Sequence, residues 1–205
     1  MILKVGLTGG LASGKSTIAE GLAARGIPVR DADRMVHDLY APGGAGSRAI
    51  GQAFGREFLL PDGSVDRKKL SVEVFHDREA LSKLNGLIHP LVRDAQARWF
   101  AELESRREPL GVIEATLLVE TGGRERFDVL VAVSAPPEVR LQRAIHRSDK
   151  TDPNEFIQRM AAQFSDAARE QVSDIVVRTD GTKEELEPKI DELARELKKR
   201  ARAGA

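Results

Sequence analysis

The 205-residue chain has 32 basic and 32 acidic side chains, so its formal net charge is zero and no whole-molecule field that gathers nucleic acid is expected. It contains no cysteine, which excludes disulfides, thiolate nucleophiles and cysteine-bound zinc. Residues 1–6 lack the features of a signal peptide and no apolar run is long enough to span a bilayer, so we expect a cytoplasmic protein with no membrane partner.

The first elements of the chain are predicted to be a strand, a tight loop, a helix and a second strand. Residues 2–8 form a short apolar run, and a helical pattern extends from residue 15 to residue 25. Gly26 is suited to end that helix, and residues 27–29 predict the next strand. This order within about 30 residues indicates a βαβ unit, which places both strands in a parallel sheet.

The predicted loop reads Gly-Gly-Leu-Ala-Ser-Gly-Lys-Ser at residues 9–16, which matches the phosphate-binding pattern G-x-x-x-x-G-K-[ST]. Its N–H groups form an anion-binding nest, and the following helix adds its positive end. Lys15 is expected to reach the β- and γ-phosphates of a nucleotide, and Ser16 to hold Mg²⁺. A chance match is the alternative, but the strand before the loop and the helix after it argue against chance. The predicted nucleotide-binding residues are Gly9, Ala12, Ser13, Gly14, Lys15, Ser16 and Thr17.

Two carboxylates follow the predicted second strand, in the sequence Asp31-Ala32-Asp33. This position is at the carboxyl edge of the sheet, where α/β proteins bind ligands. One aspartate could orient an attacking hydroxyl group or accept its proton, and the other could cap the next helix. The residues alone do not decide which aspartate has which role.

The middle of the chain is predicted to be helical. Residues 41–46 predict a loop, and residues 47–107 have a helical pattern with a turn at Asp62-Gly63. His89-Pro90 predicts the start of a long helix, because proline suits the first turn and His89 could cap it. The segment contains no convincing strand, so we interpret it as a helical insertion between the second and third strands.

Strand signals return after the insertion. Continuous apolar runs at residues 110–115 and 129–134 are typical of parallel strands covered on both faces. The rest of the chain predicts, in order, a helix that begins at Pro136-Pro137, a helix at residues 154–163, a strand at residues 175–177 and a last helix capped by Thr182.

The helix after Pro136-Pro137 carries Arg140, Arg143 and Arg147, whose spacings of three and four residues place them on one face. Guanidinium groups that close over a transferring phosphoryl group stabilise its negative charge. An exposed charged face is the alternative explanation for this pattern. The arginines favour a kinase with a lid.

A GTP-dependent switch is the main competing class. Such proteins carry a guanine-reading [NT]-K-x-D element after a strand, and the nearest match here is Asp-Lys-Thr-Asp at residues 149–152. That segment begins with Asp, which lacks the required amide, and it follows a helix. A solvated loop is the simpler interpretation, so the sequence favours a kinase.

Several segments together resemble the dephospho-CoA kinase family over residues 1–195. They are residues 9–17, Asp31-Ala32-Asp33, Leu-Asn-Gly-Leu-Ile-His-Pro at residues 84–90, Leu-Leu-Val-Glu at residues 117–120, the arginine helix and Ala162-Gln163. The phosphate loop alone is shared by many nucleotide-binding proteins. The other segments are more specific.

The resemblance implies an α/β fold with a three-layer P-loop NTPase core around a parallel sheet. Residues 1–205 would form a single kinase domain. Its core would comprise residues 1–40, 108–138 and 170–205, with a helical CoA-binding insertion at residues 41–107 and a helical lid at residues 139–169, all to within a few residues. The resemblance also implies transfer of the γ-phosphoryl group of ATP, with Mg²⁺, to the ribose 3′-hydroxyl of dephospho-CoA, giving CoA and ADP. Another small-molecule kinase with a different acceptor is the alternative, and the oligomeric state is left open.

The resemblance assigns roles to individual residues. Asp33 matches the proposed base of the family, Lys15 belongs to the phosphate loop, and Arg143 and Arg147 match lid arginines. The acceptor-binding residues implied are Asp33, His89 and Glu120.

The chain departs from the family pattern at three positions. Glu114 stands where Asp is common, Thr116 where Pro is usual, and Thr179 where Asn is frequent near the end. If the last position touches the adenine of ATP, the selectivity for the donor is affected. None of the three changes removes a residue assigned to chemistry.

Overall fold

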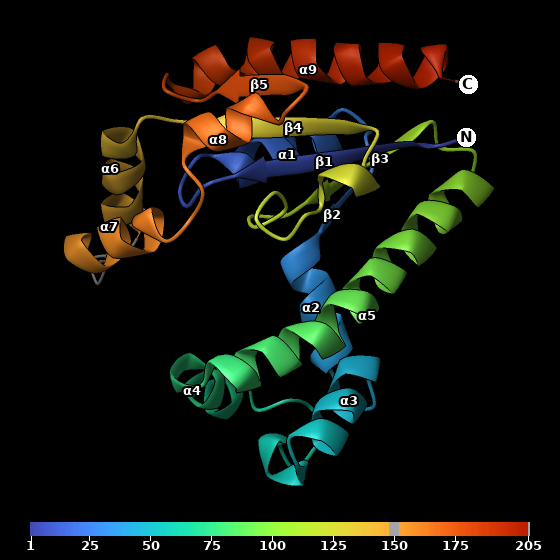
Figure 1. Ribbon diagram of the computed structural model, residues 1–205. Helices are drawn as coiled ribbons and strands as arrows, with labels where there is room; N and C mark the ends of the chain where they lie inside the picture. Colours follow the sequence, from blue (N-terminus) through green and yellow to red (C-terminus); the bar gives the residue numbers. More distant parts are fainter. Residues whose placement is uncertain (148–151, 205) are drawn as a thin grey trace. The chain divides into compact units, whose positions relative to one another are not determined.

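The structure is a computed structural model that describes residues 1–147 and 152–204 (Figure 1). The chain divides into two compact units, of which unit 1 is Met1–Arg30 with Glu102–Ala205 and unit 2 is Asp31–Ala101. Each unit has a hydrophobic cluster of its own. Among the described residues, no helix is both long and apolar enough to cross a bilayer.

Unit 1 is organised around a five-stranded parallel sheet with the strand order β2-β3-β1-β4-β5 (Figure 1). The strands are β1 (Leu3–Gly9), β2 (Val29–Asp31), β3 (Leu110–Glu114), β4 (Val129–Ser134) and β5 (Ile175–Arg178). Every residue of β3 and β4 is buried, as the apolar runs predicted. Because β1 is the central strand, the loop that follows it lies in the middle of the carboxyl edge of the sheet.

Helices lie on both sides of this sheet. Those of unit 1 are α1 (Lys15–Ala24), α6 (Pro137–Arg147), α7 (Pro153–Ala161), α8 (Asp166–Gln171) and α9 (Lys183–Ala203), with a 3₁₀ turn at Arg124–Arg126. On one face, α1 and α9 pack against each other and share a core with Val5 and Leu7 of β1. On the other face, Gly6 lies against Leu118, and α8 packs against β4. The predicted α/β fold class is confirmed.

Two predicted helix ends in unit 1 are confirmed in detail. Gly26, just after α1, has φ +74°, a conformation that glycine adopts without strain. At the start of α9, the Thr182 hydroxyl accepts from Glu185 N while the Glu185 carboxylate accepts from Thr182 N. This reciprocal arrangement is a capping box, and it satisfies two N–H groups that the helix leaves unpaired.

Unit 2 is built from helices. They are α2 (Ala32–Tyr40), α3 (Ala45–Ala53), a 3₁₀ turn at Arg56–Phe58, α4 (Arg67–His76) and α5 (Arg78–Ser105), whose last residues belong to unit 1. Its buried cluster contains Ile50, Phe58, Val65, Leu70 and Ile88. The predicted turn at Asp62-Gly63 is confirmed, because Gly63 has φ +85° and its N–H donates to Leu60 O.

The predicted start of the long helix at His89-Pro90 is wrong. Helix α5 begins at Arg78, where Asp77 Oδ1 accepts from Glu79 N at 2.8 Å and from Ala80 N at 3.1 Å. Pro90 therefore lies inside the helix rather than in its first turn. Apolar side chains before and after the proline pack on the same buried cluster, so the helix continues through it.

Candidate phosphate-binding site

The loop between β1 and α1 has the backbone geometry of an anion-binding nest. Gly14 has φ +88° and Ala12 has φ +55°, both in the left-handed region. A Cβ on Gly9 would lie 2.6 Å from Val133 O, so only glycine fits against β4 there. Helix α1 begins at Lys15, and its free N-terminal N–H groups therefore lie at the end of the loop.

Lys15 and Ser16 converge on a single carboxylate. Lys15 Nζ donates to Glu114 Oε1 at 2.6 Å, and Ser16 Oγ donates to the same oxygen at 3.1 Å. Glu114 is the last residue of β3, the neighbour of β1 in the sheet. The Ser16 hydroxyl and the Glu114 carboxylate are oxygen ligands of the kind that Mg²⁺ prefers, so these two residues fit the role of magnesium ligands.

Arg143 lies beside the far side of the loop. Its Nη1 donates to Thr179 Oγ1 at 3.1 Å, and its Nη2 donates to Thr179 O. The Thr179 hydroxyl in turn donates to Ser13 O at 2.5 Å. Burial, and then the positive charge of Arg147, lower the pKa of the Arg143 guanidinium. A bound anion would raise this pKa again, because its negative charge stabilises the charged guanidinium.

Arg140 does not share the position of the other two arginines of α6. It is buried, its Nε donates to Leu11 O at 2.7 Å, and its Nη1 pairs with Asp166 at 2.9 Å. Arg147, at the end of α6, is exposed. The three arginines therefore do not have one common role. Arg140 binds the main chain of the loop, whereas Arg143 and Arg147 are nearer the solvent.

Glu120 is placed next to α8. Its Oε1 accepts from Arg169 Nη2 at 2.6 Å and from Phe164 N at 3.2 Å. Arg169 is almost fully buried and also pairs with Asp166 at 3.1 Å. No local sequence pattern predicts this ion pair, since Glu120 and Arg169 lie far apart along the chain.

Asp33 and His89 belong to unit 2. Asp33 is exposed in the first turn of α2, and Asp31 Oδ1 accepts from Asp33 N at 2.8 Å. The role of Asp31 as the cap of this helix is therefore confirmed. His89 is exposed in the interior of α5, directly before Pro90, so it does not cap the start of that helix.

Sequence reasoning missed several residues around the loop. Glu114 was noted only as a departure from the family pattern, and Gln163 only as part of a motif, yet Gln163 Oε1 accepts from Leu11 N at 3.1 Å. A polar residue at the end of the strand next to β1 was the available signal for Glu114. Residues 149–151 of the guanine-reading candidate lie outside the described residues, whereas Asp152 caps α7.

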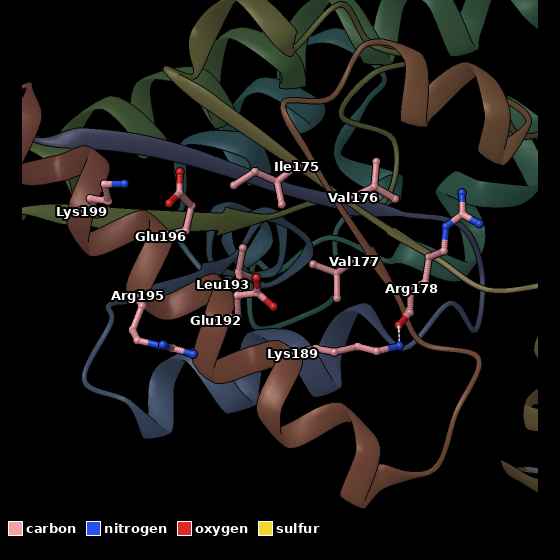
Figure 2. Close-up of a pocket in the computed structure, with 10 residues that line it drawn as sticks. All are labelled: Ile175, Val176, Val177, Arg178, Lys189, Glu192, Leu193, Arg195, Glu196 and Lys199. Atoms are coloured by element: carbon pink, nitrogen blue, oxygen red, sulfur yellow. Dashed lines mark hydrogen bonds between the residues drawn. The ribbon is translucent and has the colours of Figure 1, made fainter.

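A groove of about 640 Å³ runs between the edge strand β5 and α9 (Figure 2). Ile175 and Val176 line it from β5, and Glu192 and Arg195 line it from α9. No predicted site residue is among those that line it. We therefore take the phosphate loop, and not this groove, as the candidate site.

Comparison with known proteins gives one consistent result. A model of the family described as dephospho-CoA kinase matches residues 3–185. The dephospho-CoA kinase of Corynebacterium glutamicum is 35% identical over 196 residues, covering 96% of this chain and 98% of its own. That of Geobacter sulfurreducens is 39% identical over 189 residues, covering 92% and 95%. The crystal structure of TT1252 from Thermus thermophilus is similar with a TM-score of 0.76 and 30% identity, over 96% of this chain and 98% of that chain.

Proposed function

The chain belongs to the dephospho-CoA kinase family, and from that premise we propose that it transfers the γ-phosphoryl group of ATP to the ribose 3′-hydroxyl of dephospho-CoA. The products are CoA and ADP. The observation that carries the phosphotransferase chemistry is the loop after β1, where Lys15 and Ser16 converge on the Glu114 carboxylate. The family supports the identity of the acceptor.

The donor binds at this loop. Main-chain N–H groups of the loop and of the first turn of α1 contact the phosphates, and Lys15 exchanges Glu114 for phosphate oxygens. Ser16 and Glu114 would hold Mg²⁺, which when bound neutralises negative charge on the phosphates. Arg143, together with Arg147, offsets the negative charge that develops during transfer. The lowered pKa of Arg143 supports this role, because a bound anion would counteract the burial and the repulsion by Arg147 that lower it.

The acceptor binds at the residues that match the acceptor site of the family. Asp33 orients the 3′-hydroxyl and accepts its proton, and His89 and Glu120 contact the acceptor. The helical segment from about residue 41 to about residue 107 binds the CoA portion, and the segment from about residue 139 to about residue 169 acts as a lid that excludes water. The protein works in the cytoplasm.

The decisive assay follows ADP and CoA together. With ATP and Mg²⁺, we expect ADP release that depends on dephospho-CoA and equals the CoA formed. CoA itself is the matched control, because its 3′ position already carries a phosphate and offers no hydroxyl at that atom. ADP release that is independent of dephospho-CoA would contradict the proposed acceptor, and a panel of other alcohols would then identify the true one.

The role of Asp33 is tested by replacing each aspartate of the pair with asparagine. Asp33→Asn removes the proposed base, so we expect kcat to fall about 100-fold or more while the Kd for ATP stays the same. Asp31→Asn is the control, because asparagine is as good a helix cap as aspartate. Turnover of Asp33→Asn that equals that of Asp31→Asn would show that Asp33 is not the base.

A further inference from the structure

One residue of the phosphate loop is held in a strained backbone conformation. Ala12 has φ +55°, in the left-handed region that is unfavourable for a residue with a side chain. Strain of this kind persists only where the surrounding contacts over-determine it. The contacts on either side of Ala12, at Leu11 and Ser13, therefore decide whether the loop keeps its shape.

Both main-chain polar groups of Leu11 are bound by side chains from other elements. Leu11 N donates to Gln163 Oε1 at 3.1 Å, and Leu11 O accepts from Arg140 Nε at 2.7 Å. A Cβ on Gly10 would collide with the Arg140 guanidinium, so this group lies directly against the main chain of the loop. Leu11 is thus fixed from two directions, immediately before the strained residue.

Arg140 is itself held by a chain of alternating charges. Its Nη1 pairs with Asp166 Oδ2 at 2.9 Å, Asp166 Oδ1 pairs with Arg169 Nη1 at 3.1 Å, and Arg169 Nη2 pairs with Glu120 Oε1 at 2.6 Å. The Arg140 and Arg169 side chains are 6% and 2% exposed. Buried guanidinium groups are tolerated only when paired, so each link of this chain restricts the position of the next.

We propose that Arg140 is a positioning residue for the phosphate loop, which with Gln163 fixes Leu11 so that Ala12 keeps its left-handed conformation and the N–H groups after it face the phosphates. Asp166 and Arg169 hold Arg140 in place, and Glu120 anchors the chain in addition to its proposed place beside the acceptor. This role differs from the expectation that Arg140 closes over the phosphoryl group. The proposal rests on the proposed nucleotide site, but it is tested by ATP affinity and not by transfer to dephospho-CoA.

Arg140→Lys keeps the positive charge but cannot bind Leu11 O and Asp166 in the same forked geometry. Arg124→Lys is a matched control, because Arg124 also donates to a main-chain oxygen, Phe127 O, and to an aspartate, Asp174. It lies at the opposite, amino-terminal end of the sheet, where Asp174 precedes β5.

We expect the Kd for ATP, measured by calorimetry with Mg²⁺ and without acceptor, to rise about tenfold in Arg140→Lys. Both variants should lower the unfolding temperature, but Arg124→Lys should leave the Kd unchanged.

The strained residue provides a rescue experiment. Glycine adopts a positive φ without cost, so adding Ala12→Gly to Arg140→Lys should restore several-fold of the lost ATP affinity. The same change added to Arg124→Lys should give no such gain. Wild-type ATP affinity in Arg140→Lys, or the absence of rescue by Ala12→Gly, would overturn the proposal.

Asp166→Asn keeps the proposal testable if Arg140→Lys does not fold. It loosens Arg140 without touching the loop, and we expect a smaller loss of ATP affinity that Ala12→Gly again reverses. An Asp166→Asn protein with unchanged ATP affinity would count against the proposal. A wild-type protein that binds ATP but does not phosphorylate dephospho-CoA would contradict the proposed function alone.

Discussion

At the scale of single residues, Glu114 is the side chain on which the two loop residues with assigned chemistry meet. The Lys15 and Glu114 side chains are 12% and 11% exposed, so their ion pair is only weakly screened by solvent. In the absence of nucleotide, this pair neutralises a lysine that would otherwise be a costly partly buried charge. In the proposed function, Glu114 therefore competes with phosphate for Lys15 and would offer an oxygen near Ser16 for Mg²⁺.

The Glu114→Gln variant separates the effect of Glu114 on Lys15 from its proposed effect on Mg²⁺. We expect the Kd for ATP without Mg²⁺ to stay the same or fall, because Lys15 is released from its carboxylate. The Mg²⁺ concentration needed for half-maximal turnover should rise about tenfold, because a charged oxygen ligand is lost. The measurement is a Mg²⁺ titration of ADP release.

Glu114→Asp is the control for that experiment. It retains the carboxylate and installs the residue that is common in the family pattern, so it should titrate close to the wild-type protein. A Glu114→Gln protein with the Mg²⁺ dependence of the wild type would show that this carboxylate does not help to hold the metal.

At the scale of elements, the 28-residue helix α5 contains a residue that helices normally exclude from their interior. Pro90 lacks the N–H that would bond to Gly86 O, and its ring crowds the preceding turn. It follows the proposed acceptor residue His89, and prolines are a common cause of helix kinks. The proline therefore has a cost in stability, and it restricts the backbone of His89, the residue before it.

Pro90→Ala should stabilise the helix and disturb the acceptor site. We expect the free energy of unfolding, measured by urea denaturation, to rise by about 1–3 kcal/mol because the missing hydrogen bond is restored. The KM for dephospho-CoA should rise at the same time, because His89 loses its direction.

Gly86→Ala in the same helix is the control. A Cβ at Gly86 meets nothing within 4 Å, so this change should add about 0.5–1 kcal/mol of stability through helix propensity alone. Its KM for dephospho-CoA should not change. A Pro90→Ala protein that is less stable than the wild type would show that the proline is matched to the local backbone.

At the scale of the whole molecule, the proposed contacts of the two substrates are distributed over two compact units. The phosphate loop, Glu114 and Arg143 belong to unit 1, as does the proposed acceptor residue Glu120. The other two proposed acceptor residues, Asp33 and His89, belong to unit 2. Each unit has its own buried cluster, so each can respond to a ligand through its own local stability.

Amide hydrogen exchange should separate the two substrates. With ATP and Mg²⁺, we expect slower exchange in residues 9–17 and in α6, because a ligand stabilises the segments that it contacts. With dephospho-CoA alone, the slower exchange should appear in α2, in the part of α5 around His89 and around Glu120. Removing Mg²⁺ with a chelator should weaken only the first pattern, and protection by dephospho-CoA that is confined to unit 1 would contradict the acceptor assignment.

The sequence by itself determined the βαβ unit, the buried strands β3 and β4, the phosphate loop and the helix cap at Thr182. These features depend on residues that are neighbours along the chain, such as the glycines and the lysine of the loop or the threonine before the last helix. Local backbone preferences and apolar periodicity decide them, so a short window of sequence is sufficient. The predicted start of α5 was wrong because it relied on the proline at residue 90 and overlooked Asp77, which caps the helix.

Only the tertiary structure decided which side chains surround the loop. Glu114 reaches Lys15 across 99 positions of the chain, Gln163 reaches Leu11 across 152, and Arg140 reaches the same residue across 129. No local pattern carries these pairings, because they depend on strand order and on how the helices pack against the sheet. The spacing of the three arginines of α6 predicts one role for all of them. In the structure, Arg140 is buried against the main chain of the loop, whereas Arg147 is exposed. A charged side chain takes its role from the partners that the fold brings to it, and those partners are distant in the sequence.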